Sequence, residues 1–279
     1  MSRRRQKKRT EKDEPRRGKA SRLRKAAVAL LGVALLSAAL AAGLVLSGLT
    51  GGGPSAPSAA IVDQLSLTQP NPDFAASATD ILKQAGYAVD YFPGEEVTVE
   101  FYRNLPTHDY ELIILRVHSG ITIEVDTATG HRTKSDYVSL FTAEPYSETK
   151  YLEEQIGRPV ARLGRAPLYE GGPALFSIGP EFIEKSMRGS FDDALVVMMG
   201  CDGLRSERTA QAFLNKGASA FVSWSQAVSA SHTDAATHRL LEHLLIDKLT
   251  TREAIARTMA EVGPDPLYGA ELRVLPNEG

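Results

Sequence analysis

Hydrophobic positions divide the chain into one long apolar run near its start and many short apolar runs after it. Residues 26–49 carry no charged side chain over 24 consecutive positions. A helix needs about 20 apolar residues to cross the hydrocarbon core of a bilayer, so this run predicts a transmembrane helix. The next residues, 50–59, lack large apolar groups and mix glycine with proline, which predicts a flexible linker.

Beyond the linker, short apolar runs alternate with amphipathic segments. The runs predict strands at 60–67, 87–92, 110–117, 194–199, 220–224 and 270–275. The segments between them predict helices at 73–85, 97–104, 206–216, 234–249 and 251–261. Residues 112–115 and 194–199 are continuously apolar, which is typical of strands buried on both faces. The pattern therefore predicts one α/β domain over 60–279, with a mainly parallel sheet and helices on both of its faces.

Residues 121–190 interrupt this alternation. They are rich in β-branched, aromatic, glycine and proline residues, with a hairpin signal at 126–130 and candidate strands at 138–142, 160–163 and 174–178. We expect a β-rich insertion here. Ligands of open α/β sheets bind beyond the carboxyl ends of the parallel strands, where such an insertion lies.

The near-neutral total charge hides two opposite parts. Residues 1–25 hold thirteen Lys or Arg against three acidic residues, a local charge of +10, so the total of −2 leaves −12 for the rest. Basic flanks stay in the cytoplasm and attract anionic lipid heads. We therefore expect a single-pass protein of the cell membrane, with its basic tail in the cytoplasm and its C-terminal domain extracytoplasmic. The acidic balance of that domain argues against nucleic acid as a partner.

A cleaved signal peptide is the alternative interpretation of the amino terminus. Small residues at 37–43 and 55–60 could provide a cleavage site. However, the apolar run is longer than the roughly 7–15 residues of a usual signal-peptide core, which favours a retained anchor.

Candidate chemistry lies at the ends of two predicted strands. Cys201, the only cysteine of the chain, follows strand 194–199, and His118 follows strand 110–117. A lone cysteine outside the cytosol is a buried inert residue, an intermolecular bridge or a reactive thiol. An imidazole can take the thiol proton and later protonate a leaving amine. Glycines close behind both residues, at 120 and 203, would let backbone amides approach a developing oxyanion. The arrangement predicts a cysteine–histidine dyad for acyl transfer.

These segments resemble the caspase and hemoglobinase-like cysteine peptidases of clan CD, nearest to the bacterial CHAT-domain branch. In that family one hydrophobic strand ends in a histidine followed by glycine-type residues, and a later strand ends in a turn that carries the cysteine. The sequence Lys216-Gly-Ala218 leading into a strand with Trp224 is also similar. The specific matches lie at 110–120 and 194–240.

The resemblance implies a cysteine endopeptidase with a caspase-hemoglobinase-like fold, acting on a protein or peptide substrate without metal or cofactor. His118 would be the general base and acid, and Cys201 the nucleophile. The amides of Gly120 and Cys201 would stabilise the oxyanion. The primary specificity pocket would be lined by Ser223, Trp224 and Ser225.

The chain departs from the family pattern at two positions. Ser119 stands where many members have glycine, and Gly200 precedes the cysteine where alanine is common. A catalytically silent caspase-like domain that binds a protein or peptide partner is therefore the alternative function. A third possibility is an unrelated α/β binding domain with Cys201 in its core. His232, His238 and His243 lack the i, i+4 spacing of a zinc-binding helix, and we expect surface or capping positions for them.

Overall fold

The structure is a computed structural model that describes residues 56–276, except 126–128, 158–160 and 170. The predicted tail, the predicted membrane span at 26–49 and most of the predicted linker lie outside the described residues. Within the described part of the chain, no helix combines the length and apolar character that a membrane crossing requires.

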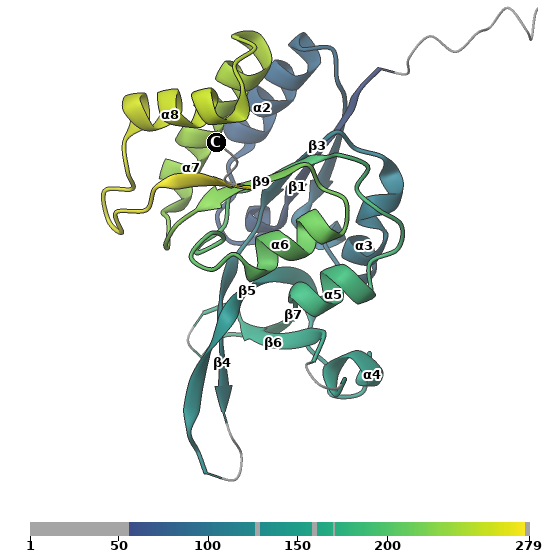
Figure 1. Ribbon diagram of the computed structural model, residues 1–279. Coiled ribbons are helices and arrows are strands. Elements are labelled where there is room, and N and C mark those ends of the chain that lie inside the picture. The colour runs from purple at the N-terminus through teal and green to yellow at the C-terminus, as the bar shows by residue number, and fades with distance from the viewer. Residues whose placement is uncertain (1–55, 126–128, 158–160, 170, 277–279) are drawn as a thin grey trace, which may run out of the picture. The chain divides into compact units, whose positions relative to one another are not determined.

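A six-stranded sheet forms the centre of the described domain (Figure 1). Its order is β10-β9-β8-β3-β1-β2, and all neighbours are parallel except β10, which runs antiparallel to β9. The strands are β1 (Ser58–Asp63), β2 (Ala88–Pro93), β3 (Leu112–Arg116), β8 (Leu195–Met198), β9 (Ala220–Trp224) and β10 (Leu272–Leu275). This mainly parallel sheet confirms the predicted α/β class.

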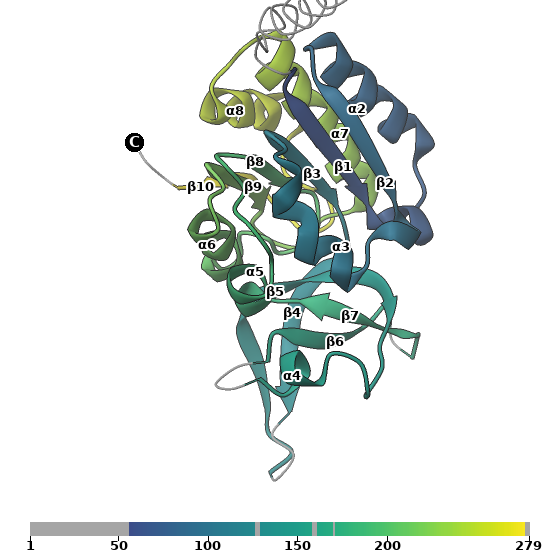
Figure 2. The ribbon, with the colours of Figure 1, turned by 90° about the vertical axis from the view of Figure 1, so that its right-hand side faces the viewer.

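Helices cover both faces of this sheet, as the continuously apolar strands require (Figures 1 and 2). One face packs against α2 (Pro72–Gln84), α7 (Ala230–Leu241) and α8 (Thr251–Val262). The other face packs against α3 (Val99–Asn104), α5 (Pro180–Lys185) and α6 (Arg208–Asn215). Successive residues of β3 alternate between the two cores, with Ile114 in the first and Ile113 in the second.

A second, antiparallel sheet follows β3 directly. Its order is β4-β5-β7-β6, with β4 (Ser119–Val125), β5 (Arg132–Pro145), β6 (Leu163–Pro167) and β7 (Ala174–Ile178). The short helix α4 (Leu152–Gln155) lies between β5 and β6. The β4–β5 hairpin extends away from the six-stranded sheet (Figure 1).

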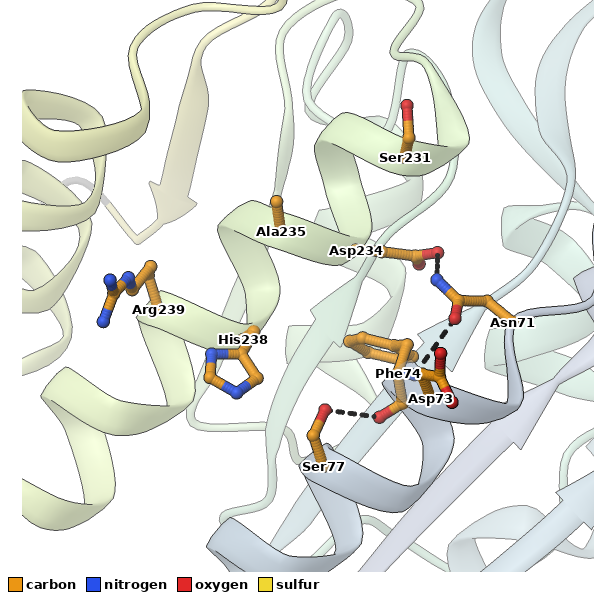
Figure 3. Close-up of a pocket in the computed structure, with 9 residues that line it drawn as sticks. All are labelled: Asn71, Asp73, Phe74, Ser77, Ser231, Asp234, Ala235, His238 and Arg239. Atoms are coloured by element: carbon orange, nitrogen blue, oxygen red, sulfur yellow. Dashed lines mark hydrogen bonds between the residues drawn. The ribbon is translucent and has the colours of Figure 1, made fainter.

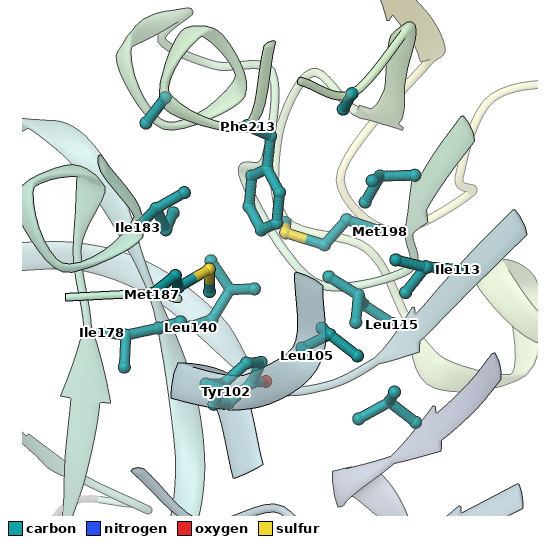
Figure 4. Packing of buried hydrophobic residues seen from close by; sticks show 14 of the residues in the cluster. Tyr102, Leu105, Ile113, Leu115, Leu140, Ile178, Ile183, Met187, Met198 and Phe213 are labelled. Atoms are coloured by element: carbon teal, nitrogen blue, oxygen red, sulfur yellow. The ribbon is translucent and has the colours of Figure 1, made fainter. Parts of the chain in front are cut away.

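Side chains of the second sheet complete the core on the face of the first sheet that packs against α3, α5 and α6 (Figure 4). Leu140 of β5 and Ile178 of β7 are fully buried in the same cluster as Leu115 of β3 and Phe213 of α6. Burying each such side chain contributes about 1.5–3 kcal/mol. The second sheet is therefore packed into the fold close to the point where β3 ends.

The element boundaries differ from the expected ones where polar side chains intervene. The first strand ends at Asp63 rather than at residue 67, and Gln64–Leu67 form a 3-10 turn. Helix α2 starts at Pro72, and its N-cap is Asn71, whose Oδ1 accepts the Phe74 N–H. Helix α7 starts at Ala230 and continues into the π-helix Glu242–Ile246.

One fully buried arginine links strands and helices at the carboxyl ends of β1 and β3. Arg116, at the end of β3, donates to Asp63 Oδ1 of β1 at 2.8 Å and to both carboxylate oxygens of Asp234 of α7 at 2.8 and 2.9 Å. It also donates to the Gln69 carbonyl at 2.9 Å. Asn71 joins α2 to the same network, because its amide donates to Asp234 (Figure 3).

The network has two carboxylates for one guanidinium, so neutral donors supply the remaining hydrogen bonds. The Tyr91 hydroxyl donates to Asp63 at 3.0 Å. Burial, together with the Asp63 charge, raises the pKa of Tyr91 to about 12, which keeps this donor protonated. Every oxygen of the two buried carboxylates thus has a partner.

We predict that Arg116→Met lowers the free energy of unfolding by about 3–5 kcal/mol, because it leaves two buried carboxylates without their cation. Arg188→Met is the matched control, because Arg188 is exposed and its pair with Glu100 contributes about 0–1 kcal/mol. Denaturant titration of the full chain, followed by the fluorescence of the single tryptophan, Trp224, measures both. Equal small losses for the two variants would show that the network does not stabilise the fold.

Candidate active site

His118 and Cys201 follow the carboxyl ends of neighbouring parallel strands. Strand β3 pairs with β8 in a register that places Leu115 opposite Met198. His118 comes two residues after β3, and Cys201 comes three residues after β8. Both residues line one pocket of about 340 Å³. The structure therefore brings the two predicted catalytic residues to the same hollow.

The histidine is held from three sides. Its backbone N–H donates to Gln64 Oε1 at 2.9 Å, and its carbonyl accepts the Phe141 N–H of β5 at 2.9 Å. The Nε2 atom lies 2.8 Å from Thr68 Oγ1. Burial and then the positive charge of Arg116 lower the pKa of His118, so its imidazole is neutral at pH 7 and able to accept a proton.

The cysteine is half-buried, and its sulfur contacts the backbone of Val228. The Val228 N–H donates to Sγ at 3.5 Å, and Sγ lies 3.6 Å from the Val228 carbonyl oxygen. Burial raises the pKa of Cys201; the contact with Val228 opposes this, and the negative charges of Asp202 and Asp265 add to it. Both shifts favour the neutral forms, the thiol of Cys201 and the imidazole of His118, over a thiolate and an imidazolium.

The two departures from the family pattern occupy the same space. A Cβ atom added at Gly200 would lie 2.2 Å from Ser119 Oγ and 2.5 Å from the Val117 carbonyl oxygen. Ser119 Oγ also donates to the Cys201 carbonyl at 2.7 Å. Ser119 thus fills the volume that an alanine at position 200 would need, and its hydrogen bond joins the start of β4 to the turn that carries the cysteine.

The other predicted site residues are not among the described residues that line the pocket. Gly120 lies in β4 opposite Ser139, and it is not among the described residues that line the pocket. Ser223 and Trp224 are fully buried in β9; Ser223 Oγ donates to the Met198 carbonyl.

Trp224 and Ser225 also have partners inside the protein. The Trp224 indole donates to Thr233 Oγ1 at 2.9 Å, and Ser225 Oγ accepts the Glu271 N–H at 3.0 Å. These side chains are therefore buried, and none of them is among the described residues that line the pocket.

Loops that the sequence pattern did not single out supply the pocket wall. Gln69 precedes α2, Val228 and Ser229 precede α7, and Tyr268 precedes β10. Residues typical of turns lie around these positions and indicate loops. However, no local pattern shows that the three loops meet at the strand ends.

A buried carboxylate fixes two of these loops against each other. Asp265 Oδ2 accepts the Ser229 N–H at 2.9 Å and the Ser229 hydroxyl at 2.6 Å. Its Oδ1 accepts the amides of Leu267 and Tyr268, both at 2.9 Å. Burial alone would raise the pKa of Asp265, but these hydrogen bonds outweigh it, and the pKa is lowered. The carboxylate therefore stays charged and holds Val228 and Tyr268 beside the cysteine.

A larger hollow of about 670 Å³ lies between α2 and α7 (Figure 3). Asp73, Phe74 and Ser77 line it from α2, and Asp234, His238 and Arg239 from α7. It contains neither His118 nor Cys201. Because the predicted nucleophile and the predicted base share the smaller pocket, we treat that pocket as the candidate active site.

The expectation of a surface or capping position is wrong for His243, which is only 4% exposed. Its Nδ1 lies 2.8 Å from Asp247 and its Nε2 lies 3.2 Å from Glu261, so it joins the π-helix to α8. No group of residues in the described part of the chain has the arrangement of a metal site.

No protein-family model matches the chain, and a search of curated proteins finds no significant match. The functional argument therefore depends on the site geometry and on the motif resemblance alone.

We predict that Gly200→Ala destabilises the fold by about 1–3 kcal/mol, because the new methyl group forces the Val117 carbonyl and Ser119 apart. Gly120→Ala is the matched control, since a Cβ there meets no atom within 4 Å. Ser119→Gly in the Gly200→Ala background should recover part of the loss, because the Val117 carbonyl remains. Denaturant titration of the four chains measures these differences, and a neutral Gly200→Ala would contradict the packing argument.

We also predict that Cys201 alkylation has a higher apparent pKa in the native chain than in urea. The thiolate is the reacting species, and burial together with Asp202 and Asp265 disfavours it in the fold. Rates with iodoacetamide across pH 6–11 measure both states on the same single cysteine. A native profile that is already flat at pH 7 would instead indicate a thiolate–imidazolium pair.

Proposed function

We propose that this chain is a membrane-anchored, extracytoplasmic cysteine endopeptidase of caspase-like fold. The observation that carries the proposal is the shared pocket of His118 and Cys201 beyond the ends of the paired strands β3 and β8. The resemblance of segments 110–120 and 194–240 to clan CD peptidases adds support. The sequence order of strands, histidine, second sheet and cysteine agrees with the same proposal.

In the proposed reaction, Cys201 Sγ attacks the carbonyl carbon of the scissile peptide bond as its proton passes to His118. The C–N bond then breaks, and the imidazolium returns the proton to the leaving amine. This leaves a thioester on Cys201. Water then attacks the thioester carbon as one of its protons passes to His118. The C–S bond breaks, the imidazolium returns that proton to Cys201 Sγ, and the carboxylic acid leaves, which restores the neutral thiol and imidazole.

The surrounding groups fit these roles. The neutral imidazole that burial and Arg116 favour is the form that accepts a proton. When the His118 Nε2–H donates a hydrogen bond to Thr68 Oγ1, the imidazole is held in the tautomer in which Nδ1 is the base. The amides of Cys201 and Gly120 are the proposed oxyanion donors, of which the Cys201 amide belongs to a pocket-lining residue.

The anchor is the part of the proposal that depends on the sequence alone. The uncharged run 26–49 and the basic tail before it support a retained span with the catalytic domain outside the cytoplasm. Membrane sedimentation that resists carbonate washing and disappears on deletion of 26–49 tests this placement. Release of the domain into the soluble fraction by cleavage would contradict it.

A second candidate function is a catalytically silent domain that binds a protein or peptide. The thiol in contact with the Val228 backbone, with its raised pKa, favours this reading. In that case the pocket would bind a peptide without bond cleavage.

We predict that an electrophilic peptide warhead modifies Cys201 at least about 100-fold faster in the wild-type chain than in His118→Ala, because general base catalysis contributes about 10²–10⁴-fold. His131→Ala is the matched control, since this exposed histidine lies directly before β5, in the hairpin that extends away from the sheet. Intact-mass kinetics measure the modification. Equal rates in wild type and His118→Ala would show that the histidine does not activate the thiol.

A further inference from the structure

The pocket that contains His118 and Cys201 has no formally charged side chain among the other described residues of its wall. Its apolar part includes Leu65, Val117 and Met199, all buried. Its polar part consists of neutral groups, such as the Gln69 amide, the Thr233 hydroxyl and the Tyr268 phenol. A side chain that enters this pocket therefore contacts no Asp, Glu, Lys or Arg among the described lining residues.

The charged residues nearest to the site are each paired inside the protein. Asp265 accepts four hydrogen bonds from Ser229 and the amides after it, so no oxygen of Asp265 lacks a partner. Asp202 forms an ion pair with Arg205 at 3.3 Å. Arg116 is bound by its two buried aspartates. None of the three is a lining residue of the pocket.

The amino-terminal end of α7 also reaches the pocket through Ser229 and Ala230. A helix start carries partial positive charge, which would by itself favour an anionic side chain. Here the Asp265 carboxylate accepts both the N–H and the hydroxyl of the N-cap residue Ser229, so its negative charge offsets that field.

A charged side chain would thus lose hydration in this pocket without gaining a partner, which is costly. The pocket volume of about 340 Å³ is at the lower end of the roughly 300–1,000 Å³ of ligand pockets. The side chain of the residue whose carbonyl carbon Cys201 attacks is the substrate side chain nearest to this wall.

We propose that the peptidase selects substrates with an uncharged side chain on the residue immediately before the scissile bond. This inference rests on the proposed function and names its substrate class.

The test uses the full chain in detergent micelles and a set of otherwise identical peptide acyloxymethyl ketones. The residue beside the ketone is Ala, Leu, Met, Asn, Asp, Glu, Lys or Arg. Modification of Cys201 is followed by intact mass, with iodoacetamide as the probe of bare thiol reactivity. We expect the uncharged members to react at least about tenfold faster than all four charged members.

The outcomes separate the inference from the proposed function. Reaction with Asp, Glu, Lys or Arg warheads that equals or exceeds reaction with the uncharged ones overturns the inference and leaves the peptidase proposal intact. If no peptide warhead reacts faster than its small-molecule equivalent while iodoacetamide still modifies Cys201, the proposed function fails, and the inference falls with it.

A matched pair of variants at one exposed lining position provides the second measurement. Gln69→Glu should raise reactivity toward the Lys and Arg warheads by about fivefold, as expected for a charge pair close to water. Gln69→Lys should do the same for the Asp and Glu warheads. No opposite shift between the two variants would show that the side chain does not enter this pocket, which overturns the inference.

Discussion

The buried pairing of Arg116 with Asp63 and Asp234 is the interaction on which the arrangement of the site depends. Three segments distant in sequence, β1, β3 and α7, meet at this guanidinium, and α2 joins through Asn71. A buried cation is tolerated only when each of its donors has a well-placed acceptor, so the positions of these segments are strongly coupled. His118 comes two residues after Arg116, so its position beyond the carboxyl end of β3 follows from that coupling.

The Arg116 charge also affects the pKa of the neighbouring histidine, as the second cause after burial. Arg116 adds to burial in lowering the pKa of His118, while burial, Asp202 and Asp265 raise the pKa of Cys201. A proposed nucleophile and base that both rest neutral suit a reaction in which the proton moves as the sulfur attacks. Asp265 contributes further by holding the Val228 and Tyr268 loops beside the thiol.

The sequence predicted the α/β class and the strand ends that bear His118 and Cys201, because continuous apolar runs such as 112–115 report burial on both faces directly. It predicted a hairpin at 126–130, which the antiparallel strands β4 and β5 flank, but it did not place the start of β4 at Ser119, because the local pattern does not show that the chain enters a new sheet right after the histidine. Nor does local sequence reveal hydrogen bonds over long separations, such as Gln64 to His118 or Asp265 to Ser229. Ser119 and Gly200 looked like two independent departures, and only the spatial contact shows that they are one packing solution.

The pocket wall was the part least accessible from the sequence. The resemblance suggested Ser223, Trp224 and Ser225, at the end of β9, as pocket residues, but the fold buries them, and loop residues line the hollow. Loop positions depend on tertiary contacts, here the clamp of Asp265 and the bond of Arg116 to the Gln69 carbonyl. Such contacts leave no periodic signal in the chain.

Cleavage of a mixed peptide library by the full chain, compared with a Cys201→Ala variant, tests the central claim most directly. The account predicts new peptide termini that appear with the wild-type chain and are absent with Cys201→Ala. Peptides that bind the wild-type chain stably and are recovered intact would contradict a peptidase and favour a silent binding domain.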